Sequence, residues 1–254
     1  MSIGEIISES FRYPLGDKEN FKYPAIIFLL LGLGIAGIVT LFEFAMWFGG
    51  GSSSDFGAIL GIFAILALFL YVIFALIAPG YLVSVTREGI DQTGLIPPLE
   101  IGANIVNSIK LAILGFIYMI IPSIFAVIFV VIISSVARSD AAPALAIIGL
   151  LILLIIYLLF AFLLVVAEMR FAKYDSLSEA LSFGEVYEDL KDIGILKLLV
   201  VCIIMSILIE IIAGIGFIVA LIPVIGGLIY GCLVLPFCAL AYSYAMGLLY
   251  SDIA

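Results

Sequence analysis

The residue with the clearest chemical potential is a single acid inside a long apolar stretch. Glu210 lies in the predominantly apolar run 193–222, 12 residues before its end. At about 1.5 Å per residue, its carboxyl group would lie roughly 18 Å inside a membrane-spanning helix. Ionisable groups at such a depth are costly to insert and mark candidate functional sites. Glu210 could therefore bind a proton or a cation, or it could serve only helix packing. Its candidate hydrogen-bond partners are Ser206, Tyr118 and Tyr157.

Three further ionisable residues lie at the ends of apolar runs. Glu43 is close to the outer end of the first run, near Trp47, where interfacial solvation or a pair with Arg138 would explain it. Glu43 and Glu210 are the two intramembrane acid candidates. Glu168 and Arg170 close the fourth run, and we expect them to act as ordinary interfacial anchors.

A group of acids forms a stripe along one face of a helix predicted at 183–192. The stripe opposes an apolar face at helical spacing, with a further acid and Ser176 spaced as a capping box at the start of the segment. The acidic stripe comprises Glu185, Glu188, Asp189 and Asp192. Such a stripe could bind a divalent cation or a basic partner, but it is more typical of a solvated face.

The chain lacks the residue clusters that catalysis requires. It contains no His, which removes the commonest metal ligand and the usual general base near neutral pH. Cys202, Cys232 and Cys238 all lie in apolar runs, where cysteine packs as a small hydrophobe. No compact group of nucleophile, base or metal ligands occurs in the apolar segments. We therefore expect a protein that is not an enzyme and that binds no cofactor or metal.

Composition identifies lipid as the solvent of this chain. The hydrophobic fraction is 66% and the mean hydropathy is +1.41, well above the 45–50% apolar content of soluble domains. A bilayer-spanning helix needs about 20 predominantly apolar residues. The net charge of −9 and the pI near 4.3 argue against nucleic acid as a partner. Six segments qualify as spans: 23–48, 56–79, 110–136, 143–167, 194–222 and 226–250.

The distribution of basic residues predicts the orientation of these spans. Nine of the ten Lys and Arg residues fall on one side of a six-span topology, and only Arg138 falls on the other. Because cytoplasmic loops carry the excess of Lys and Arg, both termini are expected in the cytoplasm of a multi-pass protein of the cell membrane. The nine residues are Arg12, Lys18, Lys22, Arg87, Lys110, Arg170, Lys173, Lys191 and Lys197.

An amphipathic stretch precedes each odd-numbered span. The stretches at 3–12, 100–109 and 183–192 alternate apolar and polar faces at helical spacing, which suits helices that lie in the headgroup region or dock on the bundle. The expected fold is thus all-α, a single integral membrane domain over 1–254. One amphipathic helix followed by a two-helix hairpin recurs every 85 residues or so, indicating three parallel repeats at 1–88, 89–174 and 175–254.

Glycine and proline mark candidate packing and kink positions. Two glycine pairs have the spacing that lets membrane helices approach closely, within one chain or between chains. Three prolines fall inside or near the ends of spans, where they would bend the helix and frame a cavity or act as hinges. The positions are Gly57, Gly61, Gly227, Gly231, Pro79, Pro122 and Pro236.

One block of sequence resembles a known family. The segment 79–87 reads PGYLVSVTR, and the residues that follow it to position 122 continue the similarity. They are Gly89-Ile90-Asp91, Pro97-Pro98, Glu100-Ile101-Gly102, Val106, Lys110-Leu111, Gly115-Phe116-Ile117-Tyr118 and Pro122. The block resembles a largely archaeal, uncharacterised multi-span membrane family, domain of unknown function 4013. The resemblance implies a membrane architecture and no assigned activity.

Two functions fit these patterns. The first is a non-catalytic organising or accessory role through contacts with membrane lipids, partner membrane proteins or further copies of the chain. It follows from the amphipathic stretches and from spans with almost no polar lining. The alternative is a transporter of ions or small molecules that is coupled to protons or cations through Glu210.

Overall fold

The computed structural model describes residues 1–48, 54–136, 142–222 and 225–254, and side chains within 1–38, 61–135, 143–222 and 225–254. Every regular element in these ranges is helical. The elements are α1 (Ile3–Gly16), α2 (Lys22–Phe48), α3 (Ser54–Asp91), α4 (Ile101–Val136), α5 (Ala142–Tyr174), α6 (Leu177–Ala180), α7 (Phe183–Ile193), α8 (Ile195–Ala220), α9 (Ile225–Ile229), the π-helical turn η1 (Tyr230–Val234) and α10 (Leu235–Tyr250).

The predicted all-helical membrane protein is confirmed in its main features. Five helices within the described residues are long and apolar enough to cross a membrane. Of the first predicted span, the part Lys22–Ile38 is described as a shorter apolar helix, so the count of six stays a prediction, as does the triplication. The five helices are Gly61–Asp91, Ile101–Ser135, Pro143–Tyr174, Ile195–Ala220 and Ile225–Tyr250.

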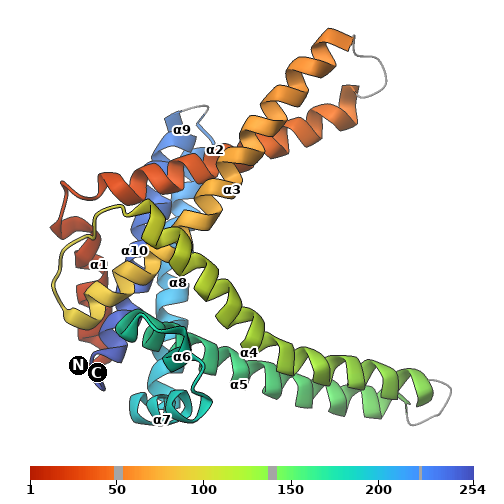
Figure 1. Cartoon of the computed structure of the whole chain (residues 1–254), viewed down its shortest axis with the longest axis vertical. Helices are drawn as coiled ribbons and strands as arrows, with labels where there is room; N and C mark the ends of the chain where they lie inside the picture. The colour runs from red at the N-terminus through yellow and green to blue at the C-terminus, as the bar shows by residue number, and fades with distance from the viewer. Residues whose placement is uncertain (49–53, 137–141, 223–224) are drawn as a thin grey trace.

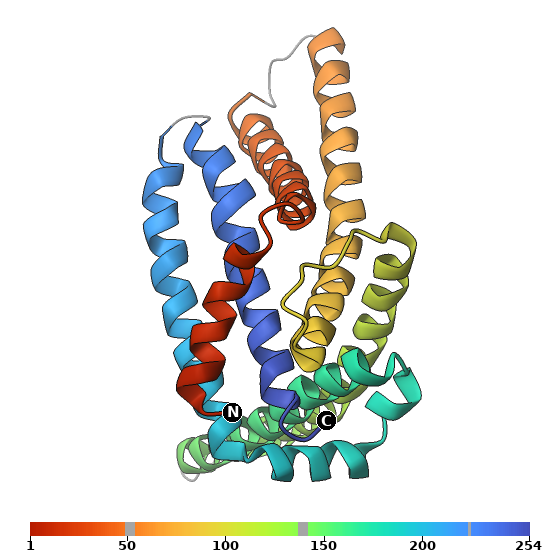
Figure 2. The same ribbon diagram turned by 90° about the vertical axis from the view of Figure 1, so that its left-hand side faces the viewer.

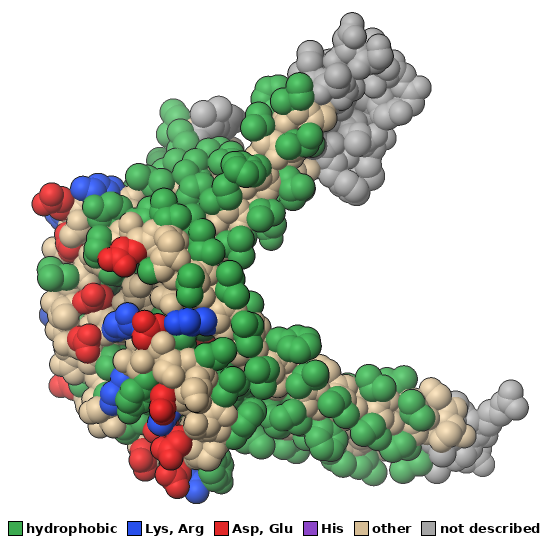
Figure 3. Space-filling view, in the orientation of Figure 1, with side chains coloured by type: hydrophobic (Ala, Val, Ile, Leu, Met, Phe, Trp, Pro, Cys, Tyr) green, Lys and Arg blue, Asp and Glu red, His purple; other side chains and the backbone are tan. Residues whose placement is uncertain are grey.

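The spans form three hairpins that diverge from a common base. Helices α2 and α3 point away from the hairpin of α4 and α5, and α8 stands beside α10 in a third direction (Figure 1). Figure 2 shows the α8–α10 hairpin from the side of the termini. Hydrophobic side chains cover the described parts of both outer arms, whereas charged side chains gather over the base (Figure 3). The hairpins therefore share contacts at one end and separate toward the other.

Helix α1 stands against α10 and helps to build the base. Its start is capped on both sides: the Ser2 N–H donates to the Glu5 carboxylate (2.7 Å), and the Glu5 N–H donates to Ser2 Oγ (3.3 Å). The hydrogen bond from the Ser2 backbone keeps the pKa of Glu5 below its usual range. The Tyr13 ring stacks on that of Tyr244 with centroids 3.9 Å apart, and Ile6 is fully buried. The apolar face predicted for this segment is thus docked on a span.

The stretch at 100–109 does not form a separate helix. It is the first part of α4. Its polar face is turned toward the protein and its apolar face outward, the reverse of a helix that docks by its apolar side. Asn104, Asn107 and Ser108 are buried, whereas Val106 and Ile109 are about half exposed. Of these buried groups, Ser108 Oγ accepts a hydrogen bond from the Gly80 N–H at 2.7 Å, whereas the side-chain nitrogen of Asn104 has no hydrogen-bond partner among the described residues.

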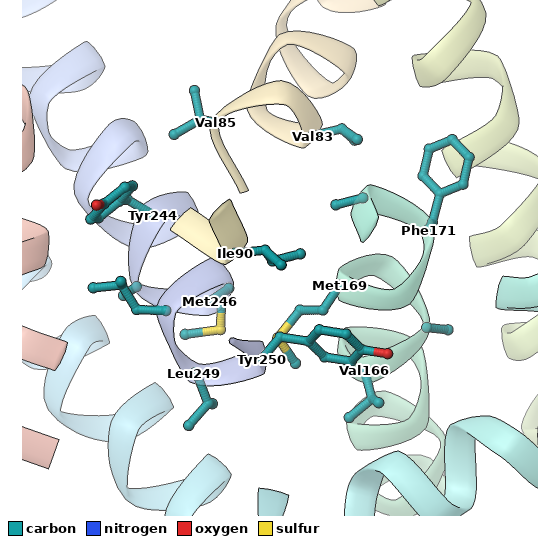
Figure 4. Packing of buried hydrophobic residues seen from close by; sticks show 14 of the residues in the cluster. Val83, Val85, Ile90, Val166, Met169, Phe171, Tyr244, Met246, Leu249 and Tyr250 are labelled. Atoms are coloured by element: carbon teal, nitrogen blue, oxygen red, sulfur yellow. The ribbon is translucent and has the colours of Figure 1, made fainter. Parts of the chain in front are cut away.

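A buried cluster at the base joins the three hairpins. Side chains from α3, α5 and α10 point toward one another there, among them Ile90, Met169 and Tyr250 (Figure 4). Buried tyrosines also hydrogen-bond to the segments that connect α3 to α4 and α5 to α7. The Tyr81 hydroxyl donates to the Pro97 carbonyl at 3.0 Å, and the Tyr118 hydroxyl donates to a carbonyl of α6 at 2.9 Å. A buried tyrosine hydroxyl needs such an acceptor, so the links are held in place as parts of the base.

Two glycines of α3 allow its neighbours to approach to backbone contact. A Cβ added at Gly80 would lie 1.8 Å from the Asn104 carbonyl oxygen of α4, and one added at Gly89 would lie 3.0 Å from the Cα of Gly247 in α10. The Gly80 N–H also donates to Ser108 Oγ at 2.7 Å, next to the helix-interior proline Pro79. Proline is tolerated in membrane helices when a neighbouring side chain satisfies the backbone that it disturbs.

Candidate functional site

Glu210 lines a groove between α8, α10 and the bases of α2 and α3. The groove has a volume of about 390 Å³. Glu210 is exposed at the surface of the chain and takes part in none of the ion pairs or hydrogen bonds found among the described residues. The groove is mostly apolar, and its lining residues are Phe28, Leu82, Ser206, Ile209, Glu210, Leu235, Cys238, Ala239, Tyr242 and Ser243.

A second acid lines a neighbouring cavity. Glu168 of α5 borders a cavity of about 250 Å³ together with residues of α3, α4 and α10. The two spaces share Leu82, Tyr242 and Ser243 as lining residues. The two acids therefore line adjoining spaces that have the hydroxyl-bearing Tyr242 and Ser243 in common. The sequence marked Glu168 only as an anchor, because its neighbours in the chain say nothing of this cavity.

The predicted partners of Glu210 are distributed over different parts of the fold. Ser206, one turn earlier on α8, lines the same groove. Tyr118 instead donates to the Ala180 carbonyl, and Tyr157 lies 3.5 Å from Ser123 Oγ. Neither tyrosine lines the Glu210 groove. The groove can thus offer an occupant one carboxylate and a few hydroxyl groups in apolar surroundings.

The acidic stripe is divided between a buried ion-pair cluster and solvent. Arg170 of α5, whose side chain is only 7% exposed, pairs with Asp189 at 2.8 Å and with Glu185 at 3.4 Å. It also pairs with Glu179 at 3.0 Å and donates to that residue's carbonyl oxygen at 3.1 Å. The Tyr250 hydroxyl donates to Asp189 at 2.6 Å. Two members of the stripe therefore dock α7 on the base.

The other two members, Glu188 and Asp192, are exposed. No group of three or more His, Cys, Asp or Glu residues in the described ranges is arranged to hold a metal ion. The role of Arg170 could not be read from the sequence, because Lys173 was an equally plausible partner for the acids that follow it. The only signal in the sequence was composition, because the segment that follows Arg170 is rich in acids and poor in bases.

The glycine and proline candidates have different surroundings. An added Cβ would meet nothing within 4 Å at Gly61 or Gly227, and only ordinary contact with Leu29 at Gly231. Close approach within the chain occurs at other glycines, and contacts of these three between chains stay a prediction. The candidates Glu43 and Gly57 lie where the structure does not describe side chains.

The helical backbone continues past all three prolines. Pro79 and Pro122 lie inside α3 and α4, whereas Pro236 occupies the first turn of α10 directly after the π-helical turn η1. A π turn widens the helix locally and is a common way to accommodate a disturbed backbone. Whether any of the three acts as a hinge stays a prediction.

Comparison with known proteins gives a family and no activity. A family model described as "Protein of unknown function (DUF4013)" matches residues 63–224, which is more than half of the chain. No curated protein and no solved structure matches it. The matched range contains Gly80, Arg170 and Glu210, so it covers the contact of α3 with α4 and the ion-pair cluster, whereas the α2 and α10 residues that line the groove lie outside it.

Proposed function

The chain belongs to the DUF4013 family of proteins of unknown function, and from this premise we propose a non-catalytic organising or accessory role in the membrane. The role is exerted through contacts of the apolar hairpins with lipids and partner membrane proteins. The proposed setting is the cell membrane of an archaeon, with both termini in the cytoplasm, as the distribution of Lys and Arg favours.

The divergence of the hairpins carries this proposal. Large apolar side chains on the arms remain uncovered by the chain itself: Phe63 of α3 is 61% exposed and Phe116 of α4 is 68% exposed. Such extended apolar faces suit contact with lipid tails and with other membrane helices. The base, by contrast, is densely packed around tyrosine side chains that are fully buried. A rigid base that presents separate apolar arms is suited to holding other components.

Photocrosslinking in native membranes tests this proposal. With benzoylphenylalanine at Phe63 or Phe116, we expect adducts with lipids or with discrete other proteins, because both positions face away from the chain. The same substitution at Phe74, which packs against the base cluster, is the matched control and should give adducts within the chain. Adducts at Phe63 and Phe116 that only join one hairpin to another would mean that the arms close on each other, and the proposal would fail.

The alternative function, transport coupled to protons or cations, has one observation in its favour. Glu210 lines a groove together with the hydroxyl-bearing Ser206, Tyr242 and Ser243, and acids at membrane depth often carry coupling ions. If this function holds, Glu210→Gln reduces ion-driven uptake in reconstituted vesicles to the level of empty vesicles. Uptake that is equal in the wild type and the variant would reject the coupling role. A Ser123→Ala variant, changed away from the groove, is the control.

A further inference from the structure

Glu210 lies at the centre of an uncovered face of α8. Ile203, Ile207 and Ile211 on the same helix are each about half exposed. These residues and Glu210 follow the spacing of three and four that places side chains on one side of a helix. Gly214, one turn further on, would have open space around an added Cβ. The result is a stripe along α8 that is apolar, has a small residue and contains one carboxylate.

The chain itself supplies no cation to this carboxylate in the part that the structure describes. Lys18 lines a different groove, together with Ile212 and Phe237. Ile212 is two residues from Glu210, about 200° around the helix, so that groove borders another face of α8. The basic residues of the spans, such as Arg87 and Lys197, lie near the base ends of their helices.

We propose that the Glu210 face of α8, with the groove beside it, receives a transmembrane helix of another protein that carries a Lys or Arg at the same depth. This proposal rests on the proposed function and specifies the partner's chemistry. Charge complementarity selects the occupant, because an uncompensated acid is costly in a spanning helix and a buried cation removes that cost. A second copy of this chain would bring an acid and apolar side chains to the same place, and therefore no counter-charge.

The surroundings of the carboxylate also fit a helix that carries a cation. Ser206 and Ser243 line the groove next to Glu210 and can accept hydrogen bonds from the protons of an ammonium or guanidinium group that the carboxylate leaves free. The exposed isoleucines and Gly214 provide a surface on which a helix backbone can approach closely. The apolar stripe supplies contact area, and the ion pair with Glu210 fixes the position of the partner helix along the membrane normal.

A synthetic helix provides a direct test. The probe is a leucine–alanine transmembrane peptide with one central Lys, incorporated with the full-length protein into phosphatidylcholine vesicles and measured by energy transfer from a dye on the peptide. We expect the Lys peptide to bind the wild-type protein about tenfold more tightly than the same peptide with a central Gln. In the Glu210→Gln protein this difference should disappear.

The matched control is Glu168→Gln, which removes the acid of the neighbouring cavity on α5 and should preserve the preference for the Lys peptide. Equal binding of the Lys and Gln peptides to the wild type would overturn the inference. The inference would also be overturned if the protein self-associates through Glu210 and thereby excludes the peptide. In that case the occupant of the Glu210 face would be a second copy of this chain. Either result would leave intact the adducts expected at Phe63 and Phe116, so the failure of this inference is distinguishable from failure of the proposed function.

Discussion

Replacing Arg170 by Ala is expected to detach α7 from the base and to lower the free energy of unfolding by about 3 kcal/mol. Removing one partner of a buried ion pair leaves the other charge uncompensated, which typically costs 3–5 kcal/mol. We expect the lower end of this range, because Glu179 and Glu185 are 47% and 61% exposed and can be solvated. Asp189, only 16% exposed, would keep just the hydrogen bond from Tyr250. Thermal unfolding in detergent, followed by circular dichroism, measures the loss.

A local measurement separates detachment of α7 from general unfolding. Lys191 lies on α7, and trypsin should cleave there faster in Arg170→Ala than in the wild type at temperatures well below unfolding. The matched control is Arg12→Ala: the Arg12 side chain is 75% exposed and pairs only with Glu9 at 3.5 Å, and exposed pairs contribute little. If both variants unfold at the same temperature as the wild type, the Arg170 cluster does not hold α7.

Gly80→Ala is expected to destabilise the protein by at least about 2 kcal/mol. The new methyl group would lie 1.8 Å from the Asn104 carbonyl oxygen and 2.6 Å from its carbon, so the α3 and α4 backbones must move apart. Overpacking of this kind costs about 1–3 kcal/mol and sometimes more. Separation of the helices would also weaken the hydrogen bond from the Gly80 N–H to Ser108. The gain in helix propensity, at most about 1 kcal/mol, offsets only part of the loss.

The same helix offers a control for Gly80→Ala. Gly61→Ala adds a methyl group where nothing lies within 4 Å, so the unfolding temperature in detergent should stay unchanged or rise slightly. Gly102→Ala does the same on α4, the partner helix. If Gly80→Ala unfolds at the same temperature as the two controls, α3 and α4 do not meet at this residue. Loss of stability in all three would instead point to a general intolerance of alanine.

Hydropathy was sufficient to predict five of the spanning helices but not how they are arranged. The apolar runs were long enough to identify the spans, because lipid selects for length and composition. The same apolar composition gives no information about neighbouring helices. Helix α5, for example, is apolar on all sides, so no face of it indicates which helix it contacts. The divergence of the hairpins therefore could not be inferred from the sequence. Among the glycines, the sequence also could not distinguish Gly80, which meets a backbone, from Gly61, which meets open space.

The polar residues of α4 lie on its buried side, which the sequence pattern did not specify. At 100–109 an amphipathic pattern suggested an apolar face suited to the headgroup region or to docking. In the structure Asn104 and Ser108 are buried and Val106 is exposed, so the apolar side of this stretch is the one left free for lipid. The position of Glu210 within its span was predictable from spacing. Its groove was not, because Leu82 and Tyr242 reach it from helices that are distant in the sequence.

The contact of Gly89 with Gly247 has a mechanical consequence for the hairpin of α2 and α3. In α3, 35 residues separate Gly89 from the first residue, Ser54, a distance of about 52 Å along a straight helix. With no side chain at either glycine, the backbones of α3 and α10 lie in direct contact, and a side chain added at either position would tilt α3 away from α10. A rotation of about 10° would sweep the far end of a lever of this length through about 9 Å. A small change of packing at the base would thus become a large displacement at the far end of the hairpin.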